Sequence, residues 1–312
     1  MPLVFVFLTF FVWSTSFTLG KATLEFAPPV FLTGVRMLLA GVILLGFLAV
    51  ARREDLKIRK AHLFPLILLA VSGVYLTNVF EFWGLQYLTA TKTCFIYSLS
   101  PFLSALFSYL QFKEKVTPRK FLGLGIGFLG FLPYLMQQSG SEGLLGGVSF
   151  LSWAEIALMV AVITSVYGWI LLRKLGKDEG MSPVMANGSS MILGGCIALL
   201  HSFFVESWAP FPVSNYVGFF QGVALMILVS NIICYNLYGW LLKKFTATFL
   251  SFAGLMTPLF AAFFGWAFLG ETVTWIFFLS IGIISIGLGI VYFEELRLGY
   301  FSTPAPTPAR EN

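Results

Sequence analysis

Three polar side chains recur at intervals of three within one long apolar segment, namely Tyr75, Asn78 and Glu81. Side chains with this spacing lie on one arc of a helix. A second apolar segment repeats the pattern with Asn231, Tyr235 and Tyr238. A carboxylate surrounded by aromatic rings attracts a cationic, partly planar solute, by charge at Glu81 and by cation–π contact and stacking at the rings. The two polar faces together predict a shared binding cavity.

Other polar and aromatic residues of apolar segments are candidates for the same cavity. Trp13 corresponds to Tyr167 if a repeat offset of 154 residues is used, with a register good to one residue. The alternative for each aromatic residue is a place in the interfacial belt or in helix packing, and for Glu81 an exposed position at the rim of its segment. The further candidates for substrate binding are Trp13, Ser16, Tyr97, Ser100 and Tyr167.

Arg36 is a cation near the middle of its apolar segment. Charges at that depth are costly and are candidates for function, but an arginine can also snorkel or pair with a neighbouring carboxylate or carbonyl. We expect a scaffold or gating role for Arg36 rather than direct ligand contact. Glu114 and Glu271 stand beside Val-Thr pairs at the ends of apolar segments, where we expect each to cap the following helix.

The elements that position these residues are duplicated. Residues 89–117 begin Thr-Ala-Thr and contain Pro101, and residues 246–274 repeat this pattern 157 positions later with Pro258. A proline within a helix removes a backbone hydrogen bond and kinks the helix. Helix interruptions at matching places in two halves are the best sequence indication of a transporter's central site. We therefore expect Pro101 and Pro258 to break their helices beside the cavity, the alternative being a tolerated kink.

The composition is that of a helical membrane protein. Of the 312 residues, 58% are hydrophobic and 11% are charged, whereas about a quarter are charged in soluble domains. The apolar runs are close to the roughly 20 residues that span a bilayer as a helix, and they lack the alternation of barrel strands. The formal net charge of +5 requires no nucleic-acid partner, since basic residues mark the cytoplasmic loops of membrane proteins.

Ten spans are predicted, in two halves of five. Sixteen of the nineteen Lys and Arg residues fall in loops or tails on one side of these spans, which predicts that both termini are cytoplasmic. We expect the first repeat at residues 1–137, a linker at 138–150, the second repeat at 151–294 and a cytoplasmic tail at 295–312. The predicted spans are residues 2–20, 29–51, 62–84, 89–110, 119–137, 151–172, 183–204, 216–241, 246–268 and 274–293.

The duplication also covers the second and last spans of each half. Gly34 and Gly41 correspond to Gly188 and Gly195 at an offset of 154 residues. Because each half has an odd number of spans, the second half enters the membrane from the opposite face, and inverted repeats permit alternating access to a site at the midplane. Spaced glycines in the fifth and tenth spans predict close helix packing, either within the bundle or between two subunits, so a monomer or a homodimer is possible.

The chain lacks the motifs of several enzyme classes. It contains no Walker A loop, no nucleophile elbow and no HExxH motif. We therefore expect no enzymatic activity, no cofactor and no metal site, and movement driven by an ion gradient or by exchange rather than by ATP hydrolysis in this chain.

These features resemble the EamA-type transporters of the drug/metabolite transporter superfamily. The resemblance is carried by WSTSFTLGK at 13–21, by Arg36 of the second span, by SLSPFLSALFSYLQFKEKVT at 98–117 and by TPLFAAFFGWAFLGETVT at 257–274. Lys113 departs from the family's helix-end motif, which has glycine there. The resemblance implies a ten-helix secondary transporter of the inner membrane, with a cavity lined by the first, third, fourth, sixth, eighth and ninth helices.

Within this family the chain is most similar to the S-adenosylmethionine and S-adenosylhomocysteine exchangers of obligate intracellular bacteria. A carboxylate among aromatic rings suits S-adenosylmethionine, which offers a sulfonium, an ammonium and an adenine. The main alternative is an amino-acid or drug exporter driven by a proton gradient. An intramembrane enzyme would require a paired acid and base or a metal cluster in the spans, and a channel or structural protein would show no saturable flux.

Overall fold

The computed structural model describes residues 2–88, 93, 96–138, 147–148, 151–260 and 275–300. Within these residues the regular elements are helices, apart from a short antiparallel hairpin of β1 (Gly147–Val148) and β2 (Leu151–Ser152) at the end of the predicted linker. The predicted all-α membrane class is confirmed. The Thr-Ala-Thr at residues 89–91 and Glu271 lie outside the described residues.

The helices of the first half follow the predicted spans. The first, second, third and fifth spans coincide with long helical segments, and the fourth is described mainly from Ser100 onward. The elements are α1 (Pro2–Trp13), α2 (Thr15–Thr23), α3 (Pro29–Ala51), η1 (Arg53–Asp55), α4 (Lys60–Leu69), η2 (Ala70–Leu76), α5 (Thr77–Tyr87), α7 (Ser100–Phe112) and α8 (Pro118–Gln138).

The second half has a matching order of helices. The predicted ninth span is described as far as residue 260, in a helical segment that starts with α13. The elements are α9 (Trp153–Arg173), η3 (Lys174–Asp178), α10 (Pro183–Val205), α11 (Tyr216–Met226), η4 (Ile227–Cys234), α12 (Tyr235–Leu241), α13 (Ala247–Ala253), η5 (Gly254–Met256) and α15 (Trp275–Arg297).

Seven of the described helical segments are long and apolar enough to cross a membrane. The shorter apolar segment Ala247–Phe260 is described in addition to these seven. Large apolar side chains such as Phe64, Phe204 and Phe278 are exposed on the outside of the bundle, as lipid-facing residues are in a membrane. The chain is therefore a multi-pass membrane protein. The seven segments are Pro2–Thr23, Pro29–Ala51, Lys60–Tyr87, Trp153–Asp178, Pro183–Val205, Tyr216–Leu241 and Phe278–Arg297.

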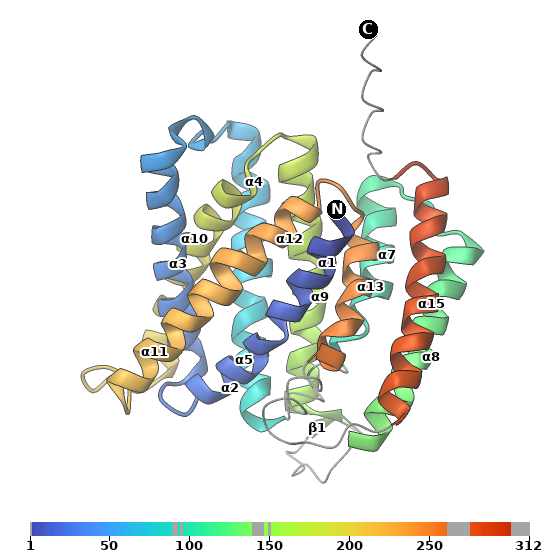
Figure 1. Cartoon of the computed structure of the whole chain (residues 1–312). Coiled ribbons are helices and arrows are strands. Elements are labelled where there is room, and N and C mark those ends of the chain that lie inside the picture. The colour runs from blue at the N-terminus through green and yellow to red at the C-terminus, as the bar shows by residue number, and fades with distance from the viewer. Residues whose placement is uncertain are drawn as a thin grey trace, which may run out of the picture.

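The helices pack in pairs drawn from both halves. α3 packs on α10, α7 on α13, and α8 on α15. In Figure 1 the pair α3 and α10 lies at one side of the bundle and the pair α8 and α15 at the other. The start of α1 and the end of α15 lie toward the same end of the bundle, which we call the terminal end, and β1 lies at the opposite end. Between the outer pairs, α1 and α2 pack along α11, η4 and α12, while η2 and α5 pack on α9.

Glycines that correspond between the two halves bring α3 and α10 together. A Cβ atom on Gly41 would lie 2.8 Å from the carbonyl oxygen of Gly188, and one on Gly195 would lie 3.1 Å from that of Gly34. Gly41 thus contacts Gly188, and Gly195 contacts Gly34, so each contact joins one glycine from each of the two repeat-related pairs. Larger side chains would force the two backbones apart, since small residues permit this approach between membrane helices.

A second glycine seam joins α8 and α15. A Cβ atom on Gly287 would lie 2.6 Å from the carbonyl oxygen of Gly123. A Cβ atom on Gly125, Gly282 or Gly289 would have no neighbour within 4 Å among the described residues. The predicted close packing of these two helices thus occurs within the chain at Gly123 and Gly287.

The helices are interrupted at matching positions of the two halves. The π-helical turns η2 and η4 begin at Ala70 and Ile227, which are 157 residues apart. Wide turns of this kind leave backbone carbonyls in need of donors, and they occur often at functional sites. Thr77 Oγ1 donates to the carbonyl of Ser72 at 2.8 Å, and Asn236 Nδ2 donates to that of Asn231 at 3.1 Å. A turn at residues 98–99 likewise precedes Pro101, and the 3-10 turn η5 precedes Pro258.

Candidate functional site

The interior of the bundle contains a cavity of about 130 Å³. A single water molecule needs roughly 10 to 15 Å³ of such space, so the cavity suits an organic solute better than a single ion. Its wall combines α1, α2, α3, α5, α9, η4, α12, α13 and η5 with residues near both helix-breaking prolines. The wall includes residues of all six helices implied by the family resemblance. It also includes Arg36 of α3, a helix outside that set.

The structure places most of the candidate residues in this wall. Arg36, for which a scaffold or gating role was predicted, also lines the cavity. Pro258 is part of the wall, beside the turn η5. The candidate substrate-binding residues that line the cavity are Trp13, Ser16, Asn78, Glu81, Tyr97, Ser100, Tyr235 and Tyr238.

One part of the wall is charged. The buried Arg36 side chain donates a hydrogen bond to the Asn78 side-chain oxygen and lies 4.8 Å above the centre of the Phe82 ring. The Tyr97 hydroxyl donates to a Glu81 carboxylate oxygen. Glu81 is thus held inside the cavity rather than on an exposed rim, and two opposite charges face the same space.

The other part of the wall is aromatic. The centre of the Trp169 ring lies 4.4 Å from that of Tyr238 and 5.1 Å from that of Tyr235. Trp13 meets Trp169 edge to face at 5.7 Å. The rings come from α1, α9 and α12, so both halves of the chain contribute. Such a cluster offers ring faces and edges to a planar or cationic group.

Two predicted residues lie outside the lining, one in each half. Tyr75 contacts His201 Nδ1 through its hydroxyl at 3.1 Å, and the Asn231 amide nitrogen lies 3.1 Å from the sulfur of Met37. Both residues belong to π-helical turns, η2 and η4. A π turn holds more residues than an α turn, so the expected spacing of three did not keep these side chains on the cavity face.

Tyr167 and Pro101 also lie outside the lining. Tyr167 packs against Phe107 with ring centres 5.9 Å apart. Pro101 is buried in the first turn of α7, where a proline costs no helical hydrogen bond, and the turn at residues 98–99 lies just before it.

Sequence reasoning missed Trp169, which stands two residues after the predicted Tyr167. Its signal was a tryptophan inside a span, and the repeat alignment of Trp13 pointed close to it. Small hydroxyl residues of the wall gave no periodic signal that separated them from packing residues. The further lining residues are Phe10, Phe17, Thr77, Phe82, Ser98, Ser165, Val166, Trp169, Ser230, Ser251, Gly254, Leu255 and Thr257.

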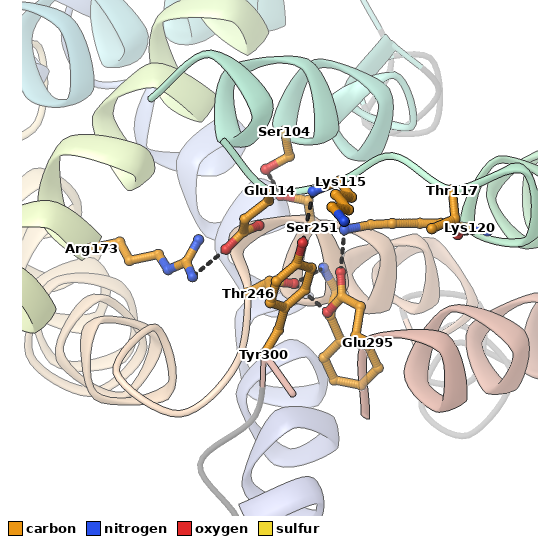
Figure 2. Close-up of polar contacts among 11 residues, drawn as sticks. Ser104, Glu114, Lys115, Thr117, Lys120, Arg173, Thr246, Ser251, Glu295 and Tyr300 are labelled. Atoms are coloured by element: carbon orange, nitrogen blue, oxygen red, sulfur yellow. Dashed lines mark hydrogen bonds and ion pairs between the residues drawn. The ribbon is translucent and has the colours of Figure 1, made fainter. Parts of the chain in front are cut away.

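Buried ion pairs lie at the terminal end of the bundle (Figure 2). Arg173 Nη2 lies 2.5 Å from Glu114 Oε1, so the expectation that Glu114 caps the following helix is wrong. The Thr117 hydroxyl accepts from the Lys120 backbone N–H instead, at 3.2 Å. Lys120 pairs with Glu295.

Comparison with known proteins identifies the family. The family model described as "EamA-like transporter family" matches residues 1–135 and 152–293. One solved crystal structure covers 95% of this chain and 98% of its own with a TM-score of 0.74 at 16% identity, which shows that the two share a fold.

Curated relatives match along almost the whole chain. A Chlamydia trachomatis serovar L2 protein named S-adenosylmethionine/S-adenosylhomocysteine transporter is 44% identical over 97% of this chain and 92% of its own. A protein of that name from Chlamydia muridarum is 44% identical over 96% and 94%. The Escherichia coli K12 protein named uncharacterized inner membrane transporter YedA is 26% identical over 96% and 92%. With its apolar helices and central cavity, this chain is a membrane transporter that belongs to the EamA-like transporter family.

Proposed function

We propose that this chain is a secondary-active transporter that exchanges S-adenosylmethionine for S-adenosylhomocysteine across the inner membrane. The 44% identity to two transporters with these named substrates, over nearly the full length of both partners, supports this assignment. The observation that carries it is the composition of the cavity wall, where Arg36 and Glu81 face the same space as the rings of Trp13, Trp169 and Tyr238.

The chemistry of both solutes fits this wall. Each has an amino-acid end with an ammonium and a carboxylate, and each has an adenine ring. Glu81 complements an ammonium, Arg36 complements a carboxylate, and the aromatic rings suit adenine and the sulfonium of S-adenosylmethionine. The candidate residues that line the cavity are therefore proposed to bind the substrate.

The proposed mechanism is alternating access by ten membrane-spanning helices in two inverted repeats. It is supported by π-helical turns at corresponding positions, by interruptions before both prolines and by the crossed glycine contacts between α3 and α10. Inverted repeats of this kind permit rocking around a central site. The basic residues gathered on one side of the predicted spans support a cytoplasmic location for both termini.

The alternative is an amino-acid exporter driven by a proton gradient. It is favoured by one feature of the cavity, since a carboxylate and a guanidinium that face the same space complement any free α-amino acid.

Uptake into proteoliposomes separates the two functions. Radiolabelled S-adenosylmethionine is offered to vesicles preloaded with S-adenosylhomocysteine, with unlabelled S-adenosylmethionine or with buffer. Saturable uptake accelerated by either internal ligand is expected. Uptake no greater than that of empty liposomes, from protein shown to be folded, would contradict this function, and saturable amino-acid uptake coupled to an imposed proton gradient would establish the exporter.

A further inference from the structure

The charged and aromatic parts of the wall lie at different heights along the first helical segment. Phe10, whose ring centre is 6.1 Å from that of Tyr238, and Trp13 belong to the aromatic part. Phe17 lies 5.9 Å from Tyr97, which binds Glu81. Seven residues separate Phe10 from Phe17, or roughly 10 Å of helix at 1.5 Å per residue. The cavity is therefore polarised along its length.

Two buried polar atoms of the wall have no hydrogen-bond partner among the described residues, Arg36 Nε and Ser16 Oγ. Buried polar groups are normally satisfied, so these atoms point to polar groups of a ligand at this level of the cavity. Arg36 and Glu81 are the charged side chains of the described wall. The aromatic part offers ring faces without a fixed charge.

We propose, on the basis of the exchange function above, that the substrate binds in one orientation. Its amino-acid end lies between Arg36 and Glu81, and its adenine stacks on the aromatic part, with Trp169 as the residue that selects adenine-bearing solutes. This arrangement explains how one site accepts both exchange partners. The zwitterion and the adenine are common to both, while the sulfonium that distinguishes them meets π-electrons rather than an obligatory anion.

Half-molecules of the substrate test this orientation. Adenosine lacks the amino-acid end and methionine lacks the adenosine, and each is measured as an inhibitor of S-adenosylmethionine uptake. Loss of a stacking ring weakens base binding by about tenfold. Trp169→Ala should raise the inhibition constant of adenosine by about that factor and leave that of methionine unchanged. Arg36→Lys keeps the charge but loses the guanidinium fork. It should raise the inhibition constant of methionine and leave that of adenosine unchanged.

Controls separate the orientation from folding and from the function itself. Trp169→Phe retains a ring and should recover most of the adenosine inhibition. Trp240→Ala removes a tryptophan outside the cavity wall, which packs with Phe5 and Lys244, and should change neither constant. If the substrate bound in the opposite orientation, Trp169→Ala would weaken inhibition by methionine and Arg36→Lys would weaken inhibition by adenosine. Equal effects of Trp169→Ala on both inhibitors would also overturn the proposed orientation. Absence of S-adenosylmethionine uptake by the unmodified protein would instead overturn the function.

A second inference comes from the terminal end of the bundle. The side chains of Glu114, Lys120, Arg173 and Glu295 are at most 6% exposed. They connect the loop after α7 with the end of α9, and the start of α8 with the end of α15 (Figure 2). Thr246, just before α13, also donates to Glu295. Groups from both halves are thereby tied together at this end.

The ties continue toward the cavity. Ser251 of the cavity wall lies 3.0 Å from Ser104, oxygen to oxygen, and so joins α13 to α7 (Figure 2). In α5 the lining residues Thr77, Asn78, Glu81 and Phe82 lie in the second half of the segment Lys60–Tyr87. The cavity thus extends away from the terminal end.

We infer that the two buried ion pairs are a latch that holds the terminal end shut. Arg173 Nε and Nη1 and Glu114 Oε2 have no partner among the described residues. Buried charges that are incompletely satisfied are costly to keep. Their attraction is offset by desolvation, and water that enters when this end opens would hydrate the separated charges. The ion pairs thus hold the terminal end closed, but the end can still open because water hydrates the separated charges.

The latch is tested with a reporter cysteine in the cavity wall, Ser165→Cys, in a chain whose Cys94, Cys196 and Cys234 are replaced by alanine. A membrane-impermeant maleimide is added to the face that bears the termini. Glu114→Gln should raise labelling from that face several-fold, and the exchanged pair Glu114→Arg with Arg173→Glu should reduce it again. Arg119→Gln removes an exposed cation 3.9 Å from Glu294 and should label like the parent. Unchanged labelling in folded Glu114→Gln protein would overturn the latch.

Discussion

Gly73 of η2 and Gly168 of α9 meet backbone to backbone beside the cavity. A Cβ atom on Gly168 would lie 2.5 Å from the Cα atom of Gly73. The contact sets the distance between the segment that carries Asn78 and Glu81 and the helix that carries Trp169. Because the obstructing atom belongs to the backbone, a side-chain rotation cannot relieve the clash.

Gly168→Ala should therefore separate these two helices and lower both stability and transport. Overpacking a well-packed interior costs about 1 to 3 kcal/mol, so we expect the melting temperature to fall by several degrees. We also expect lower uptake at equal amounts of protein. Gly46→Ala is the matched control, since a Cβ atom on Gly46 would have no neighbour within 4 Å in the described part of the chain. Equal melting temperatures for the two variants would contradict this account of the contact.

Glu81→Gln should strongly reduce transport of a cationic solute while the protein remains folded. The change keeps the shape and the hydrogen bond to Tyr97 but removes the negative charge that faces the substrate. A hydrogen bond to a charged group contributes about 1.5 to 3 kcal/mol, so uptake at low substrate concentration should fall roughly 10- to 100-fold. Glu25→Gln neutralises an exposed carboxylate at the end of α2 and should leave uptake unchanged. Normal saturable uptake by Glu81→Gln would refute the assignment of Glu81 to the site.

Asn236→Leu should destabilise the bundle by exposing the carbonyls of a π-helical turn. Asn236 Nδ2 lies 3.1 Å from the Asn231 carbonyl oxygen and 2.9 Å from that of Ile232, and its own oxygen accepts from Asn187. Leaving buried polar groups unpaired costs about 1 to 3 kcal/mol each. Thermal unfolding in detergent measures the loss, with the exposed Gln221→Leu as control. A melting temperature equal to that of the parent would show that η4 does not depend on this side chain.

The class of the fold was predictable because membrane burial acts on long stretches of sequence. Apolar runs near 20 residues, and prolines and glycines that recur in both halves, can be recognised even when helix boundaries are misplaced by a few positions. The structure confirms the helical membrane class and shows why matched glycines such as Gly41 and Gly195 recur, since they lie where two helices touch.

The facing of individual side chains was harder to predict. Asn78 and Glu81 follow the π turn and line the cavity, whereas Tyr75 within it contacts His201. A single π-helical turn changes which residues face the cavity further along the helix, and no residue type in the sequence predicts such a turn. Glu114 had a local capping pattern in the sequence, but its partner Arg173 is 59 residues away in the chain. Such long-range pairs depend on tertiary packing and leave no local signal.

One measurement tests most directly the claim that a single cavity carries both solutes in turn. Proteoliposomes loaded with labelled S-adenosylhomocysteine receive external S-adenosylmethionine with a different label, and both fluxes are followed together. We expect one molecule to leave for each molecule that enters, and Glu81→Gln to lose both fluxes. Entry of S-adenosylmethionine without matching exit of S-adenosylhomocysteine would contradict exchange through one cavity.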